Sequence, residues 1–152
     1  MSGSIGKRIA AAFALLAILG APAAAQVPST FARELARQLA QGEQVLAQHG
    51  YSRAAGPFAG GLDHRAQRRF PVTLRAGQDY RVLGVCDSRC GDLDLRLLDM
   101  NDAVIAADNL TDDVPILQIR PRTTGVHTIE VTMYRCSAGP CYFAFNVYAL
   151  SE

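Results

Sequence analysis

The sequence lacks the features that mark several common functional classes. Its only lysine is Lys7, and once the first 25 residues are set aside, 13 arginines face 14 aspartates and glutamates. That balance excludes the basic excess typical of a nucleic-acid-binding protein. The longest apolar run, Ile9–Leu19, has about 11 residues, whereas a membrane-spanning helix needs roughly 20. The chain also contains no Gly-x-Ser-x-Gly, His-Glu-x-x-His or phosphate-binding glycine motif, which argues against the common hydrolase and nucleotide-binding sites.

The N-terminal segment has the organisation of a secretory signal peptide. Lys7 and Arg8 precede the apolar run, and the small residues Ala23-Ala24-Ala25 follow it. This order predicts a signal peptide over residues 1–25 with cleavage after Ala25, an exported chain in the periplasm or outside the cell, and no membrane attachment after cleavage. The remaining residues, 26–152, are enough for one domain with a hydrophobic core.

The cysteines fit an oxidising compartment. All of them follow the predicted cleavage site, in two close pairs: Cys86 with Cys90, and Cys136 with Cys141. Each pair flanks a short turn, so we expect two local disulfides, although pairing between the two turns is an alternative. The Cys-x3-Cys and Cys-x4-Cys spacings disfavour zinc, and the absence of a Cys-x2-Cys motif disfavours thiol–disulfide catalysis.

The periodicity predicts one helix followed by strands. Ser29–Gly50 has an apolar stripe at helical spacing, with Ser29 or Thr30 as the N-terminal cap and Gly50 as the C-terminal stop. Residues 51–66 are rich in glycine and alanine without periodicity, which indicates a linker, so residues 26–66 form a helix and linker ahead of a domain over 67–152. From Arg68 the period changes to two, and seven short strands are predicted without intervening helices. We therefore expect a mainly β protein, an antiparallel jelly-roll-like β-sandwich with one N-terminal helix.

The alternation of apolar residues in the last two predicted strands does not fit a simple hairpin. If Ile129–Met133 and Phe143–Val147 formed a simple hairpin closed by Cys136–Cys141, their apolar residues would lie on opposite faces of one sheet. We therefore expect a bulge or an odd-length loop near Ser137–Pro140, with a diagonal disulfide.

Two segments, YRVLGVCDSRCGDLDLRLLDMNDAVIAAD and DDVPILQIRPRTTGVHTIEVTM, resemble the bacterial pre-peptidase C-terminal domain family over roughly Arg68 to Ala149. The resemblance implies a jelly-roll-like sandwich that serves secreted peptidases as an accessory or substrate-binding domain, in some relatives with bound calcium. His127 stands where the family often has an aromatic residue, so we expect a structural role for it. This chain differs from the pattern in its two close cysteine pairs, and we expect no attached catalytic domain.

Aspartates supply the candidate metal ligands. In a strand with Leu93, Leu95 and Leu97 facing inward, Asp92, Asp94 and Arg96 share the outer face, and loop aspartates could join them. The calcium candidates are Asp87, Asp92, Asp94, Asp112 and Asp113. The competing interpretation is that these side chains form Asx-turns and solvated edges.

The preferred function is non-catalytic binding of a protein or a glycan, with no cofactor. A candidate binding surface consists of Tyr134, Tyr142 and Tyr148, which fall opposite the inward residues; the alternative is that they form the platform for the helix. A calcium-dependent structural or adhesion domain and a small hydrolase with a dispersed site are the other hypotheses.

Overall fold

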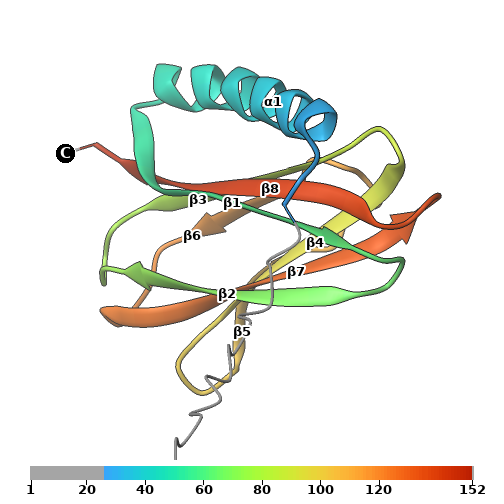
Figure 1. Cartoon of the computed structure of the whole chain (residues 1–152). Coiled ribbons are helices and arrows are strands. Elements are labelled where there is room, and N and C mark those ends of the chain that lie inside the picture. The colour runs from blue at the N-terminus through green and yellow to red at the C-terminus, as the bar shows by residue number, and fades with distance from the viewer. Residues whose placement is uncertain (1–25, 152) are drawn as a thin grey trace, which may run out of the picture.

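The computed structural model describes residues 26–151, and the predicted signal peptide lies outside them. The chain folds into two antiparallel four-stranded sheets packed as a sandwich, with one N-terminal helix, which confirms the predicted fold class. The helix crosses one outer face of the sandwich, as Figure 1 shows. Within the described residues no helix is long and apolar enough to cross a membrane.

The sandwich contains eight strands. Sheet A has the order β1-β8-β3-β6, and sheet B has the order β2-β7-β4-β5. The bounds are β1 Tyr51–Leu62, β2 Gln67–Leu74, β3 Tyr80–Cys86, β4 Cys90–Leu98, β5 Val104–Asp108, β6 Ile116–Ile119, β7 Gly125–Cys136 and β8 Cys141–Leu150.

Helix α1 spans Ser29–Gln48 and packs on sheet A. The predicted cap is wrong: Pro28 is the N-cap residue and makes no side-chain capping bond, while Ser29 and Thr30 lie in the first turn. The predicted stop at Gly50 agrees with the structure, because the helix ends at Gln48 and Gly50 adopts a φ of 82°. Buried Leu35 and Leu39 form the contact with the sheet.

The predicted linker is wrong, because most of it is strand β1, and the sandwich therefore begins at Tyr51. The pairing of β1 with β8 shifts register between Arg53 and Ala55 and again between Ala55 and Phe58. Each shift moves the following side chains to the other face, which erases the period of two that identifies a strand. Pro57 is tolerated because β1 is an edge strand, where a missing N–H breaks no ladder bond.

The predicted hairpin between the last two strands is also wrong, and with it the bulge and the diagonal disulfide. Strand β7 lies in sheet B and β8 in sheet A, so the chain crosses from one sheet to the other at Ser137–Pro140. Met133 and Phe143 are both fully buried in the core between the sheets. The two residues would point to opposite faces only if β7 and β8 paired in one sheet. Because the strands lie in different sheets that face each other, both side chains can point into the core without a bulge.

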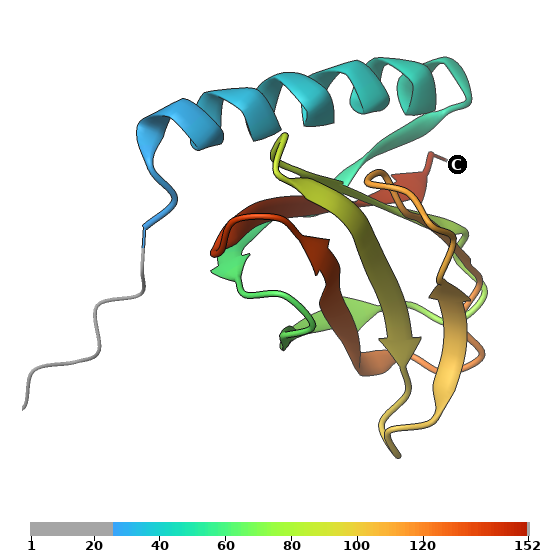
Figure 2. The ribbon, with the colours of Figure 1, turned by 90° about the vertical axis from the view of Figure 1, so that its right-hand side faces the viewer.

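Two apolar layers result. The main core lies between the sheets and includes Leu93, Leu95 and Leu97, as predicted. A second, smaller layer lies between α1 and sheet A. Figure 2 shows the helix on the side of sheet A that faces away from sheet B. Helix α1, rather than solvent, therefore covers the outer face of sheet A.

Candidate functional site

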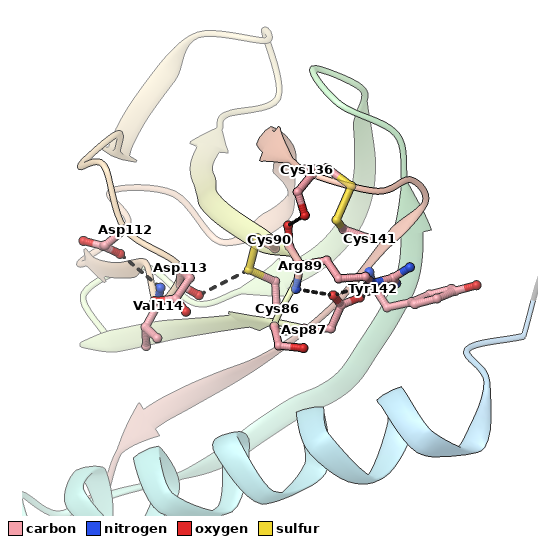
Figure 3. Close-up of a disulfide and its surroundings, with 12 residues drawn as sticks. Cys86, Asp87, Arg89, Cys90, Asp112, Asp113, Val114, Cys136, Cys141 and Tyr142 are labelled. Atoms are coloured by element: carbon pink, nitrogen blue, oxygen red, sulfur yellow. Dashed lines mark hydrogen bonds and ion pairs between the residues drawn. A yellow bond between two sulfur atoms is a disulfide. The ribbon is translucent and has the colours of Figure 1, made fainter.

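The two local disulfides are confirmed. Cys86 is bonded to Cys90 and Cys136 to Cys141. The first closes the turn between β3 and β4, and the second closes the crossover between β7 and β8. Figure 3 shows both bridges close to Asp87 and Arg89.

Asp87 is at the centre of this region and is fully buried. Its carboxylate accepts hydrogen bonds from Arg89 Nε at 3.1 Å and Nη2 at 2.8 Å, and from the backbone N–H groups of Arg89 at 2.9 Å and Tyr142 at 2.6 Å. Burial opposes ionisation, but these hydrogen bonds and the charge of Arg89 outweigh it and hold the pKa of Asp87 below its ordinary value. Asp87 is thus committed to internal contacts and is not available to a calcium ion.

Arg89 extends the same network to three elements. Its guanidinium donates to the backbone carbonyls of Ala138 and Pro140, in the crossover between the sheets. It also lies 4.2 Å from the centre of the Phe31 ring on helix α1. The CDSRC segment is therefore a structural clamp that joins the crossover, the turn and the helix, which we call the Asp87–Arg89 clamp.

Asp92 and Asp94 lie on β4, close to the loop after β5. The backbone carbonyl of Asp112 accepts a hydrogen bond from Leu93 at 2.9 Å, so this loop covers the strand. Burial raises the pKa of both carboxyls, and each is raised further by a neighbouring aspartate, Asp112 for Asp92 and Asp92 for Asp94. Asp92 is 4% exposed, and its Oδ1 has no hydrogen-bond partner within residues 26–151.

Asp112 and Asp113 do not complete a calcium site with Asp92 and Asp94. The carboxylate of Asp112 accepts a hydrogen bond from Val114 N–H at 3.0 Å, an Asx-turn, and Asp113 is exposed. Over residues 26–151 no group of three or more His, Cys, Asp or Glu side chains is arranged to hold a metal ion. Asp87, held by the Asp87–Arg89 clamp, is committed elsewhere.

The three candidate tyrosines do not form one surface. Tyr134 is exposed on β7, in sheet B. Tyr148 is fully buried under α1, and the Tyr142 ring lies 5.0 Å from that of Phe31 on the helix. Tyr142 and Tyr148 are therefore part of the platform for the helix, the alternative that the sequence left open.

The histidines of the described chain lie on different elements. His127 is buried on β7 with Nδ1 3.1 Å from the carbonyl of Gly125, in agreement with a structural role. His64 lies in the turn after β1, where Nδ1 accepts a hydrogen bond from Cys136 N–H at 3.4 Å. His49 ends the helix.

The feature that sequence reasoning missed is a groove between α1 and the β1 side of sheet A, with a volume of about 570 Å³. We call it the α1 groove. One wall is the flank of the helix: Ala32, Leu35, Ala36, Leu39 and Ala40. Its floor is formed by Pro57, Ala59, Ala144 and Asn146 of the sheet. It exists because alanines, rather than large side chains, occupy this flank of the helix where it passes over β1.

One end of the groove is polar. Asn146 donates from Nδ2 to the Tyr148 hydroxyl at 3.0 Å, and that hydroxyl donates to Glu43 Oε2 at 3.5 Å. Glu43 also lies 3.8 Å from Arg53. Burial raises the pKa of Tyr148 despite its hydrogen bond with Asn146, so the phenol stays protonated at neutral pH. Asn146 is 1% exposed, and its Oδ1 has no partner among the described residues.

Glycine at position 56 is required by this arrangement. Gly56 has a φ of 106°, and a Cβ there would lie 2.5 Å from Asn146 Oδ1 and 3.0 Å from the carbonyl of Phe145. The one sequence-level indication of the site is thus a glycine–proline pair inside a strand, which marks a bulge and a close approach of backbone to side chain.

No family model matches the chain, and no curated protein matches it.

Proposed function

We propose that the chain is an exported, non-catalytic binding module and that the α1 groove is its ligand site. The observation that carries this proposal is the groove itself, an apolar concavity with a few polar groups at one end. Ligand sites commonly have this composition and volumes of about 300–1,000 Å³. The two disulfides support an oxidising compartment, in line with the predicted signal peptide.

The lining residues support binding rather than catalysis. The polar members are Glu43, Gln44, Arg53 and Asn146, and the remaining members are apolar. Among the residues that the structure describes, the lining contains no Ser, Cys or His side chain that could act as a nucleophile or as the base beside one. The accessory role implied by the pre-peptidase C-terminal resemblance is consistent with such a module.

The composition of the groove also narrows the ligand classes. A glycan presents many hydroxyl groups and is commonly held by exposed aromatic and polar side chains, whereas this groove is walled by alanine and leucine. Of the candidate tyrosines, only Tyr134 is exposed, and it lies on the other sheet. We therefore favour an apolar ligand over the glycan considered from sequence.

A pair of variants tests the proposal. Ala36→Phe fills the groove from the helix, whereas Val45→Phe, about half a helical turn around and exposed, adds the same ring outside it. Native mass spectrometry of the protein purified from the exported fraction should show a bound ligand on the wild type and on Val45→Phe, and none on Ala36→Phe. Equal occupancy in all three proteins, or no ligand on any of them, would overturn the proposal.

A further inference from the structure

The predicted cleavage after Ala25 makes Gln26 the first residue of the exported chain. Gln26 is exposed and precedes helix α1, which begins at Ser29. Cleavage frees its α-amino group, so that this amine and the side-chain amide carbon Cδ then belong to the same residue. A bond between the amine nitrogen and Cδ closes a small lactam ring that contains N, Cα, Cβ, Cγ and Cδ. The exported chain therefore starts with a residue whose two functional groups can react with each other.

We propose that Gln26 is a modification site, at which the exported chain cyclises to an N-terminal pyroglutamyl residue. The lone pair of the α-amino nitrogen attacks Cδ, and the bond between this nitrogen and Cδ forms. The bond between Cδ and the amide nitrogen Nε2 breaks, and Nε2 leaves as ammonia with the proton that the α-amino group gives up. No redox change takes place, and no co-reactant is consumed. This inference rests on the export in the proposed function, and it is independent of the ligand of the α1 groove.

The acid–base chemistry of a free N-terminus supports this reaction at neutral pH. An α-amino group has an ordinary pKa of about 7.7–8.0, so an appreciable fraction of it is unprotonated and nucleophilic. The reacting atoms belong to one residue, which raises their effective concentration far above that of two separate molecules. Because Gln26 is exposed, the ammonia can leave into the solvent.

The structure accommodates the ring without rearrangement of the residues that follow. The ring includes neither the carbonyl carbon of Gln26 nor any atom of Val27. Val27 is partly buried against the layer under α1, and the Pro28 carbonyl accepts a hydrogen bond from Ala32 N–H at 2.9 Å. These contacts hold the start of the exported chain beside the helix both before and after cyclisation.

Cyclisation also removes a charge from an unfavourable place. Within the described residues, α1 begins without a side-chain capping bond and has no acidic residue in its first turn. An ammonium group on Gln26 would lie shortly before the N-cap residue Pro28, near the positive end of the helix dipole, where no acidic side chain of the first turn offsets it. The lactam is neutral, so the cyclised terminus fits the start of the helix better than the free amine does.

Mass spectrometry of the intact protein from the exported fraction, with its disulfides reduced, tests the proposal. After incubation at neutral pH, the main species should have the mass of residues 26–152 less one ammonia, and N-terminal sequencing should give no signal. Digestion with trypsin, which cleaves after Arg33, should place the loss on Gln26 through the fragment masses of the first peptide. The matched control is Gln26→Ala, which has no side-chain amide at the terminus. It should have the full mass of its mature chain and a readable N-terminal sequence.

The outcomes separate the modification from the export. If the wild type has the full mass of residues 26–152 and a readable sequence that begins Gln-Val-Pro, the cyclisation is refuted, while cleavage and export remain. If the wild type keeps residues 1–25 or begins at another residue, the predicted cleavage fails and the inference fails with it. If Gln26→Ala also loses one ammonia, the loss occurs at another residue, and the proposal is overturned.

Discussion

Asp87→Asn is the most informative perturbation of the Asp87–Arg89 clamp. The substitution keeps the shape and one acceptor oxygen, which retains the donors at Oδ1. It replaces Oδ2, which accepts from Arg89 Nη2 at 2.8 Å and from Tyr142 N–H at 2.6 Å, with an amide nitrogen, so that donors face donors. Two hydrogen bonds to a charged group are lost, each worth about 1.5–3 kcal/mol.

The expected cost is about 3 kcal/mol, at the lower end of that sum, since Arg89 keeps its carbonyl partners in the crossover. For a domain of this size, this lowers the melting temperature by about 10 °C. The assay is thermal unfolding by circular dichroism at neutral pH. The matched control is Asp113→Asn, which removes the same charge from an exposed carboxylate and should change stability by less than about 0.5 kcal/mol.

The pH dependence gives a second, independent check. Because the pKa of Asp87 is lowered in the folded protein, its contribution is fully present above the ordinary aspartate value and is lost as the pH falls through the lowered one. The difference between wild type and Asp87→Asn should thus be constant above pH 5 and shrink below about pH 4. A melting temperature within about 2 °C of the wild type at neutral pH, or a difference that persists undiminished in strong acid, would refute the clamp.

Two further substitutions test other parts of the structure. Gly42→Ala should destabilise the protein by about 1 kcal/mol in denaturant titrations, because the added methyl group meets buried Leu83. This is the net effect after the gain of about 1 kcal/mol in helix propensity that alanine brings. Gln41→Ala, at an exposed position of the same helix, should not destabilise the protein. Asp94→Asn should raise the melting temperature at neutral pH and lose this gain below about pH 4, because a raised carboxyl pKa makes the ionised form destabilising above it. If Asp94 instead binds calcium, Asp94→Asn should lower the melting temperature in calcium, and EDTA should lower that of the wild type.

The sequence predicts the elements whose side chains alternate without interruption. Strand β4 is the clearest case, since Leu93, Leu95 and Leu97 all point into the core as expected. Strand β1 was missed for the opposite reason: two register shifts remove the alternation, and its glycines are demanded by neighbours such as Tyr142, whose ring would lie 3.0 Å from a Cβ on Gly61. The local pattern of β1 does not reveal these constraints, because they come from β8, at the far end of the chain.

The β7–β8 connection shows a different limit. The alternation of Met133 and Phe143 is regular in both strands, but the sequence-based prediction places the two strands in one sheet, whereas the structure places them in different sheets. Four residues closed by a disulfide can also carry the chain across a sandwich, and sequence contains nothing that distinguishes the two paths. The opposed faces of Met133 and Phe143 are compatible with a bulged hairpin and with a change of sheet, and the structure has the change of sheet.

The candidate site could not be predicted from sequence, because the groove depends on which part of sheet A the helix leaves uncovered. Ala32, Ala36 and Ala40 recur every four residues, which in a sequence indicates only a good helix former. Their effect depends on the helix lying over β8 and β3 through Leu35 and Leu39, so that the alanine flank overhangs β1 and cannot fill the space above it. Asn146 then lies beneath that space rather than beneath a leucine. The groove therefore exists only when the fold brings the alanine flank of the helix over β1, and neither segment of sequence alone contains it.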